Sequence, residues 1–191
     1  MAPYGSEHLW TGGSIGETWF SEVGRTNMFK RFYPDYEVES AYTIDYRGLY
    51  ARGYRGIIFD IDNTLVPHGA PADGKSKELF RSLHKLGFGT VLLSNNKEPR
   101  VKPFADDVSS NYIFKAGKPG QAGYEKAMEL MGTDSGTTLF VGDQLFTDVW
   151  GAKKAGIVTY LVKPINPKEE IQIVLKRRLE WIVLFFYHRR K

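Results

Sequence analysis

Residues 57–65 read Ile-Ile-Phe-Asp-Ile-Asp-Asn-Thr-Leu, an apolar run that ends in two aspartates two positions apart. Such a run is typical of a buried strand. Ionised groups beside a core are costly unless a cation or a proton transfer gives them a purpose. Alternate side chains of a strand point the same way, about 6.5 to 7 Å apart, so we expect Asp60 and Asp62 to share one small space. One carboxylate can attack phosphorus while the other handles protons, which indicates phosphoryl transfer.

The two carboxylates also predict a metal ion. A carboxylate binds a phosphate dianion poorly unless a hard cation lies between them. Mg²⁺ prefers one or two carboxylates together with waters and substrate oxygens, so we expect a Mg²⁺ site here. The hydroxyl of Thr64 and the backbone N–H groups after the strand are candidates to hold the phosphate oxygens.

Two later stretches add candidate phosphate ligands. Residues 91–96, Val-Leu-Leu-Ser-Asn-Asn, end an apolar run in a hydroxyl and two amides, so Ser94 and Asn95 could bind phosphate. Residues 112–119 bring Lys118 to the start of a helix that we expect to open with Pro119. Lys118 would supply the cation that faces the phosphate.

A fourth stretch adds two acids. Residues 138–148 run from another buried, strand-like segment into Gly-Asp-Gln-Leu-Phe-Thr-Asp. Asp143 follows that segment directly, and Asp148 comes five residues later at the following helix. These two carboxylates could complete the metal site.

The four stretches resemble, in order and at suitable separations, the four motifs of the haloacid dehalogenase superfamily of phosphatases. The motifs are D-x-D-x-T at residues 60–64, Ser94, Lys118-Pro119 and G-D-x-x-x-T-D at residues 142–148. The resemblance covers residues 54–164. The strings FDIDNTL, SNN, KAGKP and GDQLFTD are also similar to those of the subfamily that includes phosphatidylglycerophosphate phosphatases.

The resemblance implies a role in catalysis for four of these residues. Asp60 would be the nucleophile that forms an aspartyl-phosphate. Asp62 would protonate the leaving oxygen and later accept a proton from the attacking water. Ser94 and Lys118 would bind the equatorial phosphoryl oxygens.

The resemblance also implies the ligands of the metal ion. Asp60, the backbone carbonyl of Asp62, and Asp143 would hold Mg²⁺, with Asp148 as a further ligand or as support for the others. The presence of Asp62 favours hydrolysis of a phosphate monoester over the other reactions of the superfamily.

Apolar, strand-like runs alternate with helical ones along the middle of the chain. We expect strands at 56–62, 90–95, 112–116, 137–142 and 157–162, and helices at 74–86, 97–105, 119–131 and 147–155. This alternation predicts an α/β, Rossmann-like parallel sheet with helices on both faces. Thr64 and Ser94 are 30 positions apart, and Ser94 and Lys118 are 24 apart, so neither gap has room for a cap domain. We therefore expect an open site.

Composition fits one globular catalytic domain with two flanking segments. The chain has 191 residues, of which 42% are hydrophobic and 25% charged. The absence of cysteine excludes disulfides and thiol chemistry and permits a cytoplasmic protein. The net charge of +4 is mild, and we expect no nucleic-acid partner. We expect a disordered extension at 1–27 without a secretory signal, a catalytic domain at 28–166 and a basic amphipathic helix at 167–191.

The expected C-terminal helix has two interpretations. Its longest unbroken apolar stretch, residues 181–187, is far below the roughly 20 residues needed to span a bilayer. The helix could lie on an anionic membrane surface, with its aromatic side chains at the interface and its arginines near the headgroups. It could equally pack on the catalytic domain with a solvated basic edge.

These observations lead to one favoured function and two alternatives. We expect a cytoplasmic, Mg²⁺-dependent phosphatase without a cap that acts on phosphatidylglycerophosphate and associates peripherally with the membrane. A phosphatase of a soluble metabolite or nucleotide would use the same residues without needing the C-terminal helix. A non-catalytic binding protein on the same fold is the third possibility, against which the intact acids and Lys118 speak. The sequence leaves the oligomeric state open.

Overall fold

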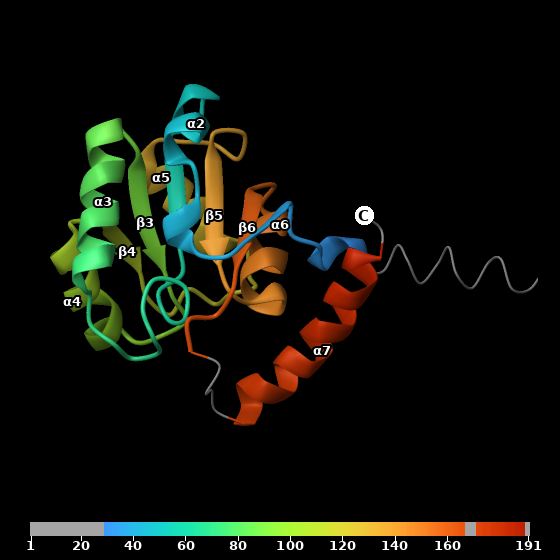
Figure 1. Cartoon of the computed structure of the whole chain (residues 1–191). Helices are drawn as coiled ribbons and strands as arrows, with labels where there is room; N and C mark the ends of the chain where they lie inside the picture. Colours follow the sequence, from blue (N-terminus) through green and yellow to red (C-terminus); the bar gives the residue numbers. More distant parts are fainter. Residues whose placement is uncertain (1–28, 167–170, 190–191) are drawn as a thin grey trace, which may run out of the picture.

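The computed structural model describes residues 29–166 and 171–189, with the backbone alone for 171–178 (Figure 1). The extension expected at 1–27 lies outside the described residues. Within them, six parallel strands form one sheet in the order β1-β6-β5-β2-β3-β4. The strands are β1 Tyr36–Val38, β2 Gly56–Phe59, β3 Gly89–Leu93, β4 Asn111–Ile113, β5 Thr138–Gly142 and β6 Val158–Val162. The predicted α/β fold with a parallel sheet is confirmed.

Helices cover both faces of this sheet. One face packs against α2 (Tyr46–Ala51), α3 (Gly74–Leu86) and α4 (Glu98–Val108), and the other against α5 (Ala122–Met131) and α6 (Trp150–Lys154). The central strands are therefore buried on both sides. All four residues of β2 are buried, as expected for a covered parallel sheet. The core consequently fixes where the central strands end, and the functional side chains follow those ends.

Several boundaries differ from the sequence prediction. Helix α3 occupies the predicted residues 74–86, because Asp73 caps its first turn and Gly87 ends it in a left-handed conformation. The first predicted strand ends at Phe59 instead of residue 62. The helix expected to open with Pro119 begins at Ala122, so Pro119 lies in the preceding loop.

Other elements were missed or are of another type. The helix predicted at 147–155 is a π-helix, Leu145–Val149, continued by α6. The tyrosine-rich segment before the first motif forms α2 and the edge strand β1, which pairs with β6. Short 3₁₀ segments lie at Lys30–Phe32 and Ala41–Thr43.

Helix α7 (Ile171–His188) lies beside the π-helix (Figure 1) and shares a hydrophobic cluster with Leu161 of β6. Its inner face packs Val183 into a cluster with Leu145, Val149 and Leu161. Its outer face exposes large apolar side chains by 39% to 67%, namely Leu179, Trp181, Ile182, Phe185 and Phe186. The helix therefore docks on the domain and still presents an apolar surface. No helix of the described residues is both long enough and apolar enough to cross a membrane.

Candidate active site

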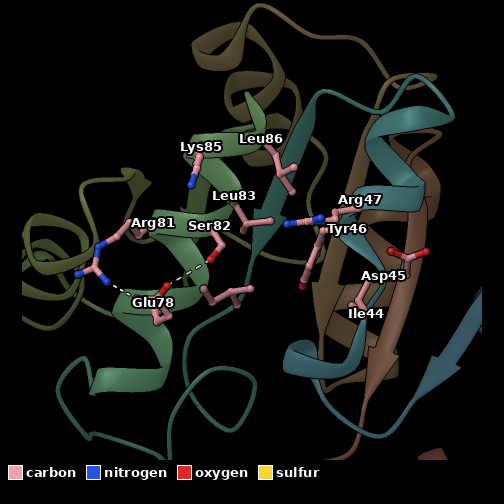
Figure 2. Close-up of a pocket in the computed structure, with 11 residues that line it drawn as sticks. Ile44, Asp45, Tyr46, Arg47, Glu78, Arg81, Ser82, Leu83, Lys85 and Leu86 are labelled. Atoms are coloured by element: carbon pink, nitrogen blue, oxygen red, sulfur yellow. Dashed lines mark hydrogen bonds and ion pairs between the residues drawn. The ribbon is translucent and has the colours of Figure 1, made fainter.

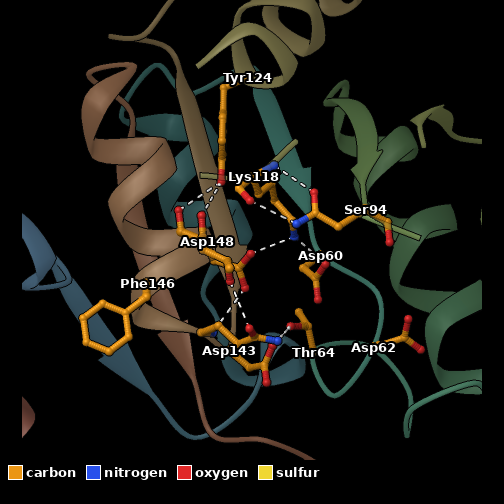
Figure 3. Close-up of polar contacts among 12 residues, drawn as sticks. Asp60, Asp62, Thr64, Ser94, Lys118, Tyr124, Asp143, Phe146 and Asp148 are labelled. Carbon is orange, nitrogen blue, oxygen red and sulfur yellow. Dashed lines mark hydrogen bonds and ion pairs between the residues drawn. The ribbon is translucent and has the colours of Figure 1, made fainter. Parts of the chain in front are cut away.

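The carboxyl ends of three neighbouring central strands meet at one edge of the sheet. Asp60 directly follows β2, Ser94 follows β3, and Asp143 follows β5. Figure 3 shows these side chains gathered at that edge, with Lys118 reaching in from the loop before α5. Ligands of open α/β sheets bind at the carboxyl ends of strands, so this edge is the candidate active site.

A buried lysine connects two of the acids. Lys118 Nζ lies 2.6 Å from Asp60 Oδ1 and 2.7 Å from Asp148 Oδ1 (Figure 3). Thr64 Oγ1 donates to Asp143 Oδ1 at 3.3 Å, which ties the end of the first motif to the fourth. These contacts link residues of the first, third and fourth predicted motifs.

Burial and neighbouring charges shift the pKa values of this cluster. Burial raises the pKa of Asp60 to about 8; the Lys118 ammonium opposes the rise, while Asp148 and Asp143 add to it. Burial acts to lower the pKa of Lys118, but Asp148 and Asp60 outweigh it and raise that pKa well above its usual range. Among the described residues, the buried carboxylates of Asp60, Asp143 and Asp148 thus lie in one cluster with the Lys118 ammonium group. A bound cation would lower the pKa of Asp60, because it would oppose the effects of burial and of the two neighbouring acids.

The same acids fit a hard metal ion. Asp60, Asp143 and Asp148 each offer a carboxylate oxygen, and these atoms all lie within 4.8 Å of one another. An all-oxygen set of carboxylates is the donor chemistry of Mg²⁺, Ca²⁺ or Mn²⁺. This cluster could hold a metal ion, as the sequence predicted for these three residues.

The Asn95 side chain positions Lys118 by bonding to the lysine backbone. Lys118 N–H donates to Asn95 Oδ1 at 2.8 Å, and Asn95 Nδ2 donates to the Lys118 carbonyl at 3.1 Å. This arrangement differs from the phosphate contact that we expected of Asn95. Ser94 is buried at the end of β3, where its hydroxyl accepts the N–H of Asn96 at 3.2 Å. The Ser-Asn-Asn segment therefore supports the loop that carries Lys118.

Asp62 lies apart from the cluster, which corrects the expectation that it shares one small space with Asp60. Because β2 ends at Phe59, the alternation of a strand does not extend to these residues. Figure 3 shows the Asp62 carboxylate turned away from Lys118. It accepts bonds from Arg100 Nη2 at 2.8 Å, Asn96 Nδ2 at 2.7 Å and Gly69 N–H at 2.8 Å. The Asp62 side chain is also not one of the three clustered acids.

Close packing fixes Asp148. Its Oδ2 accepts the N–H of Gln144 at 3.2 Å, and a Cβ at Gly142 would lie only 2.6 Å from that oxygen. The hydroxyl of Tyr124 donates to the carbonyls of Thr147 and Asp148, each at 3.1 Å. The glycine of the fourth motif is therefore needed so that Asp148 can approach the strand end.

Sequence reasoning missed three residues that contact the site or its loops: Arg100, Tyr124 and Glu180. Arg100 lies in the first turn of α4, shortly after the Ser-Asn-Asn segment, and a basic residue at that place was a usable signal. Glu180 is the one acid among the apolar and aromatic residues 179–187, which was a usable signal. No sequence pattern singles out Tyr124.

A second concave region lies away from this edge. A cavity of about 560 Å³ lies between α2 and α3. Asp45, Arg47, Glu78, Arg81 and Lys85 are among the lining residues that Figure 2 shows. Its charges are mixed, and none of the predicted site residues lines it. The cluster at the sheet edge is the stronger candidate, because a cavity alone supplies no chemistry.

Comparisons with known proteins agree with this site. The family profile of haloacid dehalogenase-like hydrolases matches residues 69–156. "Probable phosphatase YqeG" of Bacillus subtilis is 34% identical over 159 residues, which cover 82% of this chain and 92% of that protein. The chain therefore belongs to the haloacid dehalogenase-like hydrolases. Within that family, the shared sequence and the acid-lysine site identify it as a phosphatase.

Two further matches are more distant. "Phosphatidylglycerophosphate phosphatase 1, chloroplastic/mitochondrial" of Arabidopsis thaliana is 26% identical over 168 residues, which cover 79% of this chain and 47% of that protein. The chain thus spans about half the length of that relative. The crystal structure of hypothetical protein XCC2798 from Xanthomonas campestris matches with a TM-score of 0.50 and 17% identity, covering 68% of this chain and 77% of that one. This last match supports the fold alone.

Proposed function

We propose that this chain is a Mg²⁺-dependent phosphatase that hydrolyses a phosphate monoester through an aspartyl-phosphate, and that its substrate is phosphatidylglycerophosphate at an anionic membrane surface. The observation that carries the chemistry is the cluster in which Lys118 joins Asp60 to Asp148 beside Asp143. A nucleophilic carboxylate next to a fixed ammonium group and a metal site suits phosphoryl transfer.

Each residue has a task in this proposal. Asp60 attacks phosphorus with one carboxylate oxygen, and Lys118 neutralises charge on the transferred phosphoryl group. Asp62, which Arg100 and Asn96 hold at the rim, gives a proton to the leaving oxygen and then takes one back from the water that hydrolyses the aspartyl-phosphate. Mg²⁺, held by Asp60, Asp143 and Asp148, would offset the negative charge of the phosphoryl oxygens.

Two observations favour a lipid substrate over a soluble one. The Arabidopsis relative carries the name of a phosphatidylglycerophosphate phosphatase. In addition, the outer face of α7 combines exposed Trp181, Phe185 and Phe186 with Arg189, whose guanidinium lies 4.4 Å from the Phe185 ring centroid. Interfacial helices combine aromatic side chains with basic residues in this way. The outer face of α7 is therefore the membrane-facing surface in this proposal.

The first experiment measures phosphate release. Phosphatidylglycerophosphate in mixed micelles with Mg²⁺ is compared with sugar phosphates, nucleotides and an aryl phosphate, and Asp60→Asn serves as the inactive control. We expect strong preference for the lipid. Turnover of soluble esters alone would keep the reaction and reject the lipid, and no turnover of any ester would favour a non-catalytic binding protein.

A second experiment tests the membrane surface. Flotation with anionic vesicles compares the full chain with Trp181→Ser/Phe185→Ser on the outer face of α7. Leu130→Ser is the matched control, because Leu130 is exposed on α5, away from α7. We expect the double variant to float poorly and the control to float like the wild type. Equal flotation of all three proteins would exclude this surface as the membrane contact.

A further inference from the structure

Helix α7 places a buried carboxylate behind the active-site loop. Glu180 lies on the inner face of the helix and is only 6% exposed. Its Oε1 accepts the backbone N–H of Leu145 at 2.8 Å and that of Phe146 at 3.4 Å. Burying a carboxylate is costly, and hydrogen bonds to the charged group offset that cost. The carboxylate therefore holds two particular backbone groups of the loop.

Those backbone groups lie between two of the acids of the metal cluster. Leu145 is two residues after Asp143 and three before Asp148. It opens the π-helix that carries Asp148, and the first N–H groups of a helix have no partner within the helix. Glu180 supplies a partner from another element. A shift of this turn would move both carboxylates relative to Asp60.

The described residues leave a space at this joint. A cavity of about 100 Å³ lies between α7 and the loop, with Asp143, Leu145, Glu180 and Leu184 among its lining residues. Where side chains do not fill the space, fewer dispersion contacts hold the backbone in place. The hydrogen bonds of Glu180 consequently have a larger share in fixing the turn than they would in a filled core.

We propose that Glu180 is a positioning residue that holds the loop from Asp143 to Asp148 in its metal-binding geometry, so that α7 belongs to the catalytic unit as well as to the membrane surface. The inference rests on the proposed Mg²⁺ site. It predicts that removing the Glu180 carboxylate weakens metal binding even though Glu180 touches neither metal nor substrate.

The test is calorimetric titration of Mg²⁺ into the full chain without substrate. We expect Glu180→Ala to weaken Mg²⁺ binding by about tenfold or more, the size of effect seen when support of a metal ligand is lost. Glu180→Gln keeps an acceptor oxygen and should lose less, and it remains informative if the alanine variant is unstable. Gly142→Ala, whose new Cβ would press on Asp148, is the positive control for weakened binding.

Val183→Ala separates positioning from simple docking of the helix. Val183 packs in the same cluster as Leu145 but carries no carboxylate, so its truncation should lower the melting temperature while Mg²⁺ affinity stays near the wild-type value. Equal losses in Val183→Ala and Glu180→Ala would overturn the inference. Unchanged Mg²⁺ affinity in Glu180→Ala would overturn the inference about Glu180 and leave the proposed function standing. A wild-type protein that binds no Mg²⁺ would overturn both the inference and the proposed function.

Discussion

Asp60 and Asp62 come from one motif, yet their carboxylates lie in different surroundings. Asp60 is buried against Lys118, with Asp143 and Asp148 close by. Asp62 is only slightly more exposed, but it lies outside this cluster, where Arg100 and Asn96 hold it. The buried half of the site, with Asp60, Lys118 and the metal-binding acids, is held together by charges. The rim half, with Asp62, is held in place by hydrogen bonds. The variants below test each half in turn.

The largest effect is expected at the nucleophile. Asp60→Asn removes the attacking carboxylate, so turnover should fall by roughly 10⁴-fold or more while the protein stays folded. Initial rates and mass spectrometry for a trapped phospho-enzyme measure this. Asp107→Asn, an exposed acid on α4, is the control. Wild-type rates in Asp60→Asn would reject the aspartyl-phosphate.

Removing the ammonium group of Lys118 should lower both the activity and the stability of the protein. Lys118→Met leaves Asp60 and Asp148 without the ammonium, and loss of one partner of a buried ion pair costs about 3–5 kcal/mol of unfolding free energy. We expect kcat to fall by about 10²- to 10³-fold. Denaturant unfolding and initial rates measure the two effects. Lys115→Met, an exposed lysine of the same loop, should behave like the wild type.

The buried half should also respond to pH. The pKa of Asp60 is about 8 in the folded, metal-free protein against an ordinary 3.8, so folding favours the protonated form. Its contribution to stability is complete below about pH 4 and is lost as pH rises through about 8. We expect the unfolding free energy of the metal-free wild type to fall more steeply between about pH 4 and pH 8 than that of Asp60→Asn. Denaturant unfolding at several pH values measures this. Parallel pH profiles for the two proteins would contradict the raised pKa of Asp60.

The smallest effect is expected at the rim. Arg100→Gln removes a charged hydrogen bond to Asp62 that is partly exposed, and we expect kcat/KM for an aryl phosphate to fall by about tenfold. Steady-state rates measure this, with Arg81→Gln on the exposed side of α3 as the control. A loss as large as that of Lys118→Met would show that the two halves are not distinct.

Strong local signals made much of the fold and site predictable. The apolar runs predicted the central strands, and the helical run predicted at 74–86 matches the bounds of α3. The acids and Lys118 were recognisable because each follows such a run or stands at a fixed distance from one. The motif pattern therefore identified the cluster before its geometry was known.

The remaining features depend on contacts distant in sequence. The orientation of Asp62 depends on Arg100, which lies on α4, 38 positions later in the chain. Strand β1 has only three residues and a mostly exposed pattern, so it offers no periodic signal. The role of Glu180 depends on where α7 docks, which the pattern of α7 left open between two interpretations.

Residues 94–96 and 115–118, on either side of the segment that contains α4, are bonded to each other. The Asn95 side chain bonds the backbone of Lys118, and the N–H groups of Lys115 and Ala116 donate to the carbonyls of Asn96 and Ser94. These bonds fix both ends of residues 97–114, a segment that includes α4 and β4. The inner residues of the segment are tied to the core and to β3. Substitutions on its outer side, or at Arg100, can therefore alter the rim while the lysine keeps its place.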